Sequence, residues 1–107
     1  MRADSVLPVM EAGQAELVRD DYALDDHVRL APTPGHTPHH VAVCLGRDGD
    51  DAVMPGDVLH SSLQTRYPEL SPRFDVDKDA SAKTRRSFLE RYCDTWDDGF
   101  RCDSLEP

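Results

Sequence analysis

The residues best suited to chemistry are histidines that gather in one part of the sequence. Four of the five histidines fall between residues 36 and 60, namely His36, His39, His40 and His60, and Asp57 lies among them. Imidazole nitrogens and carboxylate oxygens are good ligands for zinc and similar divalent ions. The stretch is therefore a candidate metal site.

The position of two of these residues matters more than their number. His36 directly follows Gly35, and Asp57 directly follows Gly56, so each side chain can project from a loop where a strand ends. Adjacent strands ending on the same side of a sheet would bring both groups together. Taken alone, polar residues in loops rich in proline and glycine more often face solvent, and the residue types by themselves favour that ordinary interpretation.

Three short strands are expected to position the candidate ligands. Residues 28–31 and 40–45 alternate apolar with polar or small side chains, as half-buried strands do, and residues 52–54 form a third apolar segment. Proline and glycine follow the first and third segments, and residues 46–51 form a polar turn before the third. The pattern predicts a meander whose strand ends carry the histidine and the aspartate.

Helices are expected on both sides of this meander. The first covers residues 5–18 and begins at Ser5, although Gly13 weakens it. The second covers residues 79–93 and begins at Asp79, and residues 60–77 between it and the strands form an extended loop. The second helix carries an apolar stripe made of Ala82, Phe88, Leu89, Tyr92 and Cys93. The order of helix, three strands, loop and helix predicts a partial α/β layer.

Composition excludes several classes of protein. The formal net charge of −9, from 21 acidic and 12 basic residues, would repel a polyanion, so we expect no nucleic-acid partner. The longest apolar run, residues 41–45, is far short of the roughly 20 residues that span a bilayer. Three cysteines do not describe a disulfide framework, and Cys44 reads as a small core residue. With no secretory signal at the start, a cytoplasmic protein is expected.

Two motifs resemble those of the metallo-β-lactamase superfamily. The segment Thr33-Pro34-Gly35-His36-Thr37-Pro38, followed by a strand, is similar to the family's third-histidine motif, and Pro55-Gly56-Asp57-Val58 is similar to its strand-ending Gly-Asp. In that family the histidine binds one metal ion and the aspartate bridges two. The resemblance therefore implies that His36 is a metal ligand and that Asp57 is the bridging ligand.

The resemblance covers roughly residues 4–94 and extends to flanking segments. Residues 4–9, 67–70 and 82–86 resemble the branch that contains methyl parathion hydrolase and related lactonases. It implies an αβ/βα sandwich, of which this chain would form about one helix-sheet half. It also implies zinc as the cofactor, with two ions in the full-length family. The activity implied is hydrolysis of small-molecule esters, lactones or phosphotriesters by metal-bound hydroxide.

The remaining histidines are not assigned as ligands. His39 stands where the family commonly has glycine, and His40 and His60 match no ligand position, so they are interpreted as surface or supporting residues. Cys44 and the aromatic residues of the second helix are better explained by packing. No residue is assigned to substrate binding.

The family's main signature, His-x-His-x-Asp-His, is absent from the sequence, and no histidine follows the second helix. We therefore expect residues 1–95 to be the C-terminal portion of such a domain, residues 96–107 to be a divergent tail, and this truncated chain to be inactive alone. The alternative is a non-catalytic product with weak metal binding or self-association through an exposed sheet face. An acidic interaction domain unrelated to hydrolases explains neither motif.

Overall fold

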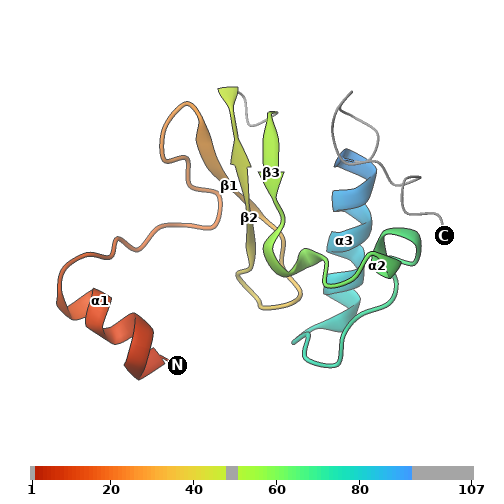
Figure 1. Cartoon of the computed structure of the whole chain (residues 1–107), viewed down its shortest axis with the longest axis horizontal. Coiled ribbons are helices and arrows are strands. Elements are labelled where there is room, and N and C mark those ends of the chain that lie inside the picture. Colours follow the sequence, from red (N-terminus) through yellow and green to blue (C-terminus); the bar gives the residue numbers. More distant parts are fainter. Residues whose placement is uncertain (1, 48–50, 93–107) are drawn as a thin grey trace.

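An antiparallel sheet of three strands forms the centre of the protein (Figure 1). The computed structural model describes residues 2–47 and 51–92. Strands β1 (Val28–Pro32), β2 (Val41–Leu45) and β3 (Ala52–Met54) lie in the order β1-β2-β3. All three predicted strands are confirmed. Residues 48–50 of the expected turn lie outside the described residues.

The register gives the sheet two different faces, because residues paired across an antiparallel ladder point to the same side. Ala42 and Cys44 of β2 are buried, whereas Val41, Val43 and Leu45 are half-buried. The side chains on the second face are all apolar: Val28, Leu30, Pro32, Val41, Val43, Leu45, Ala52 and Met54. The buried face carries the core, and the apolar face is partly open.

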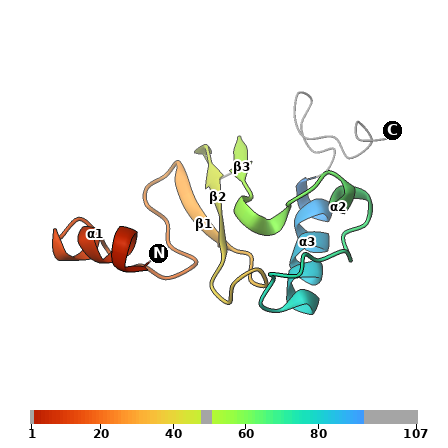
Figure 2. The ribbon, with the colours of Figure 1, turned by 60° about the horizontal axis from the view of Figure 1, so that its bottom comes forward.

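Helix α3 (Lys78–Tyr92) lies beside the sheet, next to β3 (Figures 1 and 2), and packs against its buried face. Phe88 and Tyr92 pack with Ala42 and Val58, and the Tyr92 hydroxyl lies 3.7 Å from the Cys44 sulfur. The expected helix and the packing role of these residues are confirmed, although Cys93 lies outside the described residues. Together, sheet and helix give the α/β layer that the sequence predicts.

Two details of the second helix differ from expectation. Its cap is Asp77 rather than Asp79, since Asp77 Oδ1 accepts the backbone N–H of Ala80 at 3.0 Å. The inward face is also not wholly apolar, because its first turns bury Ser81 and Arg85. A hydrophobic pattern cannot identify such residues, since they are buried by hydrogen bonds rather than by apolar contact.

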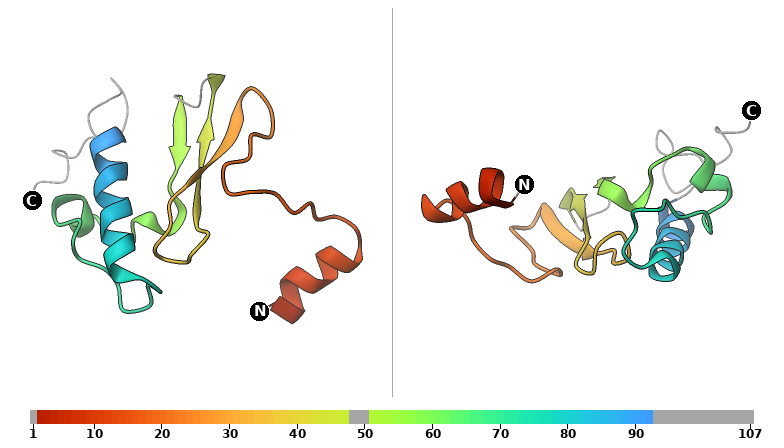
Figure 3. Two further views of the ribbon diagram at one scale, coloured as in Figure 1. Left: turned by 180° about the vertical axis from the view of Figure 1, so that it is seen from behind. Right: turned by 90° about the horizontal axis from the view of Figure 1, so that it is seen from below.

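The N-terminal segment departs from the predicted helix over residues 5–18. A π-helical turn (Arg2–Val6) leads into α1 (Leu7–Glu11), which ends well before Val18. Gly13 has a φ of 67°, which is incompatible with a continuing right-handed helix. Helix α1 buries no residue and lies apart from the sheet (Figure 3). A short helix without tertiary packing has little to stabilise it beyond its own hydrogen bonds.

The connection from β3 to α3 contains more structure than the expected loop over residues 60–77. A 3-10 turn, η3 (Gly56–Val58), and a short helix, α2 (Leu63–Arg66), precede an irregular segment. The buried Gln64 side chain holds this connection, because it accepts the N–H of His60 at 2.7 Å and donates to the Leu70 carbonyl at 2.8 Å. The connection thereby brings His60 back to the end of the sheet.

Candidate metal centre

The loop after β1 carries His36 and is pressed against the start of α3. Gly35 has a φ of 140°, and a Cβ atom added there would lie 2.3 Å from the Ser81 backbone. The Gly35 carbonyl accepts the N–H of Asp77, and the His36 carbonyl accepts that of Val76. Only glycine permits this approach. The glycine before His36 is therefore what places the imidazole beside the helix.

The turn after β3 carries Asp57, and His40 holds its backbone. His40 Nε2 accepts the Asp57 N–H at 3.0 Å, so its proton is on Nδ1, which lies 2.8 Å from the Thr33 hydroxyl. Both ring nitrogens of His40 are thus engaged. His40 supports the turn, and His39, whose side chain is 87% exposed, takes no part.

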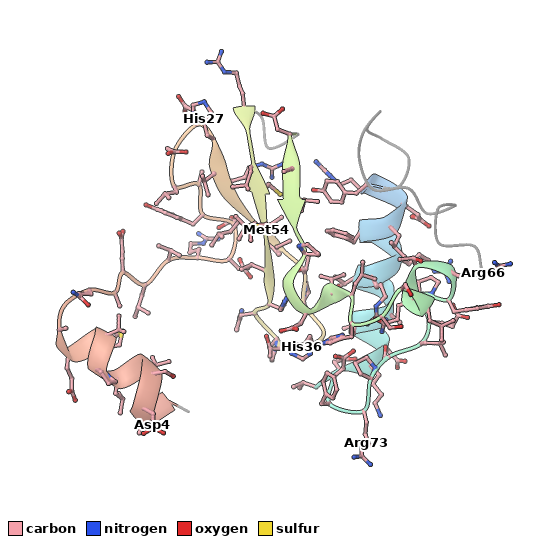
Figure 4. The ribbon with its side chains drawn as sticks, viewed as in Figure 1. Asp4, His27, His36, Met54, Arg66 and Arg73 are labelled. Atoms are coloured by element: carbon pink, nitrogen blue, oxygen red, sulfur yellow. The ribbon has the colours of Figure 1, made fainter. Side chains whose placement is uncertain are left out.

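His36, Asp57 and His60 meet at one end of the sheet. Asp57 Oδ2 lies 3.4 Å from His36 Nε2, and Asp57 Oδ1 lies 3.5 Å from His60 Nε2. The two imidazole rings are 5.2 Å apart between centroids. Figure 4 shows His36 at the end of the sheet nearest the start of α3, with His27 at the opposite end. One carboxylate therefore faces a different histidine with each of its oxygens.

A fourth group, Asp75, contacts His36 from the other side of the ring. Its side chain is fully buried, and its Oδ1 lies 2.9 Å from His36 Nδ1. Burial alone would raise the pKa of Asp75, but hydrogen bonds from Ser81 and His36, with the positive charges nearby, hold it below its usual value. Asp75 is therefore an ionised carboxylate inside the protein.

One grouping of these side chains has ligand atoms close enough together to hold a metal ion. One ligand atom from each of His36, His60 and Asp75 lies within 4.8 Å of the others. Asp57 lies beside this group, with one oxygen facing His36 and the other facing His60. Of the two carboxylates, Asp57 is the better candidate ligand, because both Asp75 oxygens already accept hydrogen bonds whereas the Asp57 side chain is 59% exposed.

The spacing around Asp57 also fits metal coordination. Ligand atoms about 2.0–2.1 Å from a tetrahedral zinc ion lie roughly 3.4 Å from one another. The contact of His36 Nε2 with Asp57 Oδ2, at 3.4 Å, matches that separation. An imidazole nitrogen and a carboxylate oxygen are also donor types that zinc accepts. The residues present therefore fit a metal ion.

Phe74 lines the side of this cluster. Its ring centroid lies 5.8 Å from that of His36 and 5.0 Å from that of His60, both edge-on. The Phe74 side chain is itself 63% exposed. It gives the candidate centre one apolar wall that is accessible from solvent.

Sequence reasoning missed three members of this cluster. His60 had a local signal, since it follows Asp57 by three residues and a single helical turn brings such residues together. Asp75 and Phe74 had none, because they lie in an irregular segment far along the chain from His36. Only the tertiary fold places them.

The chain belongs to the metallo-beta-lactamase superfamily, whose family model matches residues 5–91. Its fold is that of metal-dependent hydrolases, and members of the superfamily typically bind metal ions. A search of curated proteins found no match. Among the residues that the structure describes, no helix is both long and apolar enough to span a membrane.

Proposed function

We propose that this chain contributes His36 and Asp57 to the metal centre of a zinc-dependent hydrolase. The observation that carries the proposal is the Asp57 carboxylate, whose oxygens face His36 Nε2 and His60 Nε2 at 3.4 and 3.5 Å. The Asp57 side chain is 59% exposed, and an accessible carboxylate of this kind is suited to bridging two ions. Family membership independently supports metal-dependent hydrolysis.

Each residue has a distinct role in this proposal. His36 would hold one ion through Nε2, and Asp57 would be the carboxylate ligand shared by two ions. His60 orients the second oxygen of Asp57, and His40 fixes the backbone that presents the carboxylate. A bound ion supplies a Lewis acid and lowers the pKa of a bound water to about 7.

The proposed substrates are small-molecule esters, lactones or phosphotriesters, as in the branch that the flanking segments resemble. Catalytic zinc sites use about three protein ligands for each ion. His36 and Asp57 supply fewer, and the sequence contains no His-x-His-x-Asp-His motif. We propose that the complete centre takes further ligands from additional polypeptide, and that the present chain alone binds metal weakly.

Complementation tests this proposal. The chain is mixed with a separately produced segment of the superfamily that carries His-x-His-x-Asp-His, and hydrolysis of ester, lactone and phosphotriester probes is followed with and without zinc. Zinc-dependent hydrolysis is expected from the mixture and from neither part alone. The same mixture with His36→Ala should be inactive. Activity equal to that of the His36→Ala mixture would contradict the proposal.

The second candidate is a non-catalytic chain that self-associates, and the open sheet face favours it. Leu30, Val43 and Met54 lie side by side on this face through the strand register. Met54 is 58% exposed. A contiguous apolar sheet surface of this kind commonly marks an association site.

A further inference from the structure

His36 contacts a buried carboxylate that is not among its proposed metal partners. We propose that Asp75 is a positioning residue that holds the His36 proton on Nδ1 and aims Nε2 at Asp57, and that Arg85 joins this pair to the Asp57 turn. The inference deepens the proposed function, and it rests on that function only for the identity of the ion. Its first testable consequence is the position of the proton on the His36 ring, which can be measured without a metal ion.

The tautomer follows from the hydrogen bond. An ionised carboxylate only accepts hydrogen bonds, so the 2.9 Å contact of Asp75 Oδ1 requires a proton on His36 Nδ1. A neutral imidazole then carries a bare lone pair on Nε2, the nitrogen that lies 3.4 Å from Asp57. Hydrogen bonding of one ring nitrogen to a carboxylate is a general way to orient a metal-binding histidine.

Asp75 is itself held so that it cannot turn. Its Oδ2 accepts the Ser81 hydroxyl at 2.6 Å and lies 3.5 Å from Arg85 Nη2. Arg85 also donates to Ser81 Oγ at 2.9 Å, which directs the hydroxyl proton toward Asp75. The side chains of Asp75 and Arg85 are both fully buried. Donors therefore surround Oδ2, and Oδ1 is left for His36.

Arg85 extends the arrangement to the other proposed ligand. Its Nε donates to the Val58 carbonyl at 2.8 Å, immediately after Asp57, and its Nη1 donates to the carbonyls of Pro68 and Leu70. One buried guanidinium thus contacts the partner of His36 and the backbone next to Asp57. The two ligand-bearing segments are fixed relative to each other through α3.

Replacing Asp75 with asparagine should reverse the histidine tautomer. Ser81 and Arg85 present donors to Oδ2, so the amide of Asp75→Asn must place its oxygen there and its NH2 group toward His36. The NH2 group donates to Nδ1, and the ring proton moves to Nε2. A protonated Nε2 cannot bind a metal ion. The substitution changes shape very little, which separates this effect from loss of packing.

The test is nitrogen NMR of the full chain with 15N-labelled histidine, without metal, at about pH 8, where an ordinary histidine is neutral. Two-bond 15N–1H correlations report which ring nitrogen carries the proton, and His36→Ala assigns the signal. We expect Nδ1–H in the wild type and Nε2–H in Asp75→Asn. The matched control is Asp79→Asn, an exposed carboxylate in the first turn of α3, which should keep Nδ1–H.

Zinc affinity of the same proteins, measured by competition with a chelating dye, provides the second readout. Asp75→Asn should bind zinc about 10- to 100-fold more weakly than the wild type, and Asp79→Asn should not. A wild-type ring protonated on Nε2, or on both nitrogens, overturns the inference even if Asp75→Asn does not fold. Equal zinc affinity in the two asparagine variants also overturns it. A wild type with Nδ1–H that binds no zinc contradicts the proposed function but not the positioning.

Discussion

His36 Nε2 lies 3.4 Å from Asp57 Oδ2, although neither residue belongs to a strand. Strands β1 and β3 flank β2 and are both antiparallel to it, so their C-terminal ends lie at the same end of the sheet. The two side chains meet there because a glycine with positive φ precedes each of them, Gly35 at 140° and Gly56 at 57°. The backbone turns, rather than the strands alone, bring the candidate ligands together.

Gly35→Ala should disturb this meeting point. The added Cβ would overlap the Ser81 backbone at 2.3 Å, and the φ of 140° is strained for alanine. We expect a loss of about 3 kcal/mol or more in the free energy of unfolding, measured with urea. Gly13→Ala is the control, since its Cβ would meet nothing within 4 Å, and it should cost about 1 kcal/mol. Equal losses of unfolding free energy in the two variants would mean that the loop does not depend on the close approach of Gly35 to Ser81.

Arg85→Met should destabilise the protein much more than Arg86→Met. The first substitution leaves the buried Asp75 without its cation and removes the donors to the Val58, Pro68 and Leu70 carbonyls. Breaking a buried charge pair costs about 3–5 kcal/mol. The Arg86 side chain is 59% exposed, and its ion pair with Glu69 is long, at 3.9 Å. Its loss should therefore change the free energy of unfolding by no more than about 0.5 kcal/mol. Urea denaturation compares the two variants, and similar midpoints would contradict the role of Arg85.

Asp75 should make stability depend on acid pH. Its folded-state pKa is lowered from the ordinary 3.8, so its contribution is fully present above that value and is lost as the pH falls through the lower folded pKa. The difference in unfolding free energy between wild type and Asp75→Asn should therefore shrink below about pH 4. Denaturation curves at several pH values measure it. A difference that grows toward acid pH would show that the pKa is raised instead.

The open sheet face should support association of two copies of the chain. Met54→Lys places a charge among apolar neighbours on that face and should shift the protein toward monomer in sedimentation velocity experiments. Lys83→Met, on α3 and away from that face, is a control that should leave the distribution unchanged. Identical sedimentation of Met54→Lys and wild type would exclude this face as the contact.

The sequence was sufficient for the strands, because residues 28–31 and 40–45 alternate apolar with polar or small side chains, residues 52–54 are apolar, and proline or glycine follows each segment. The sequence was insufficient for the N-terminal helix. The apolar residues there pack against no other element, and the positive φ of Gly13 ends the helix early. Helix α3 was located correctly, but its polar inner residues, Ser81 and Arg85, were not foreseen. Their burial depends on Asp75 and on loop carbonyls that no local pattern connects to them.

The candidate site was also predictable only in part. Glycine-histidine and glycine-aspartate at strand ends pointed to His36 and Asp57, and the structure brings these two residues together. His60 and Asp75 depend on how Gln64 folds the connection and on how α3 packs, so they required the tertiary structure.

Calorimetric titration of the metal-free chain with zinc tests the central claim most directly. The wild type should bind zinc, weakly because its ligands are few, and His36→Ala and Asp57→Ala should each weaken binding at least about tenfold, or roughly 1.4 kcal/mol. His39→Ala, whose side chain is 87% exposed, should bind as the wild type does. Zinc binding that is unchanged in both His36→Ala and Asp57→Ala would contradict the assignment of these residues as metal ligands.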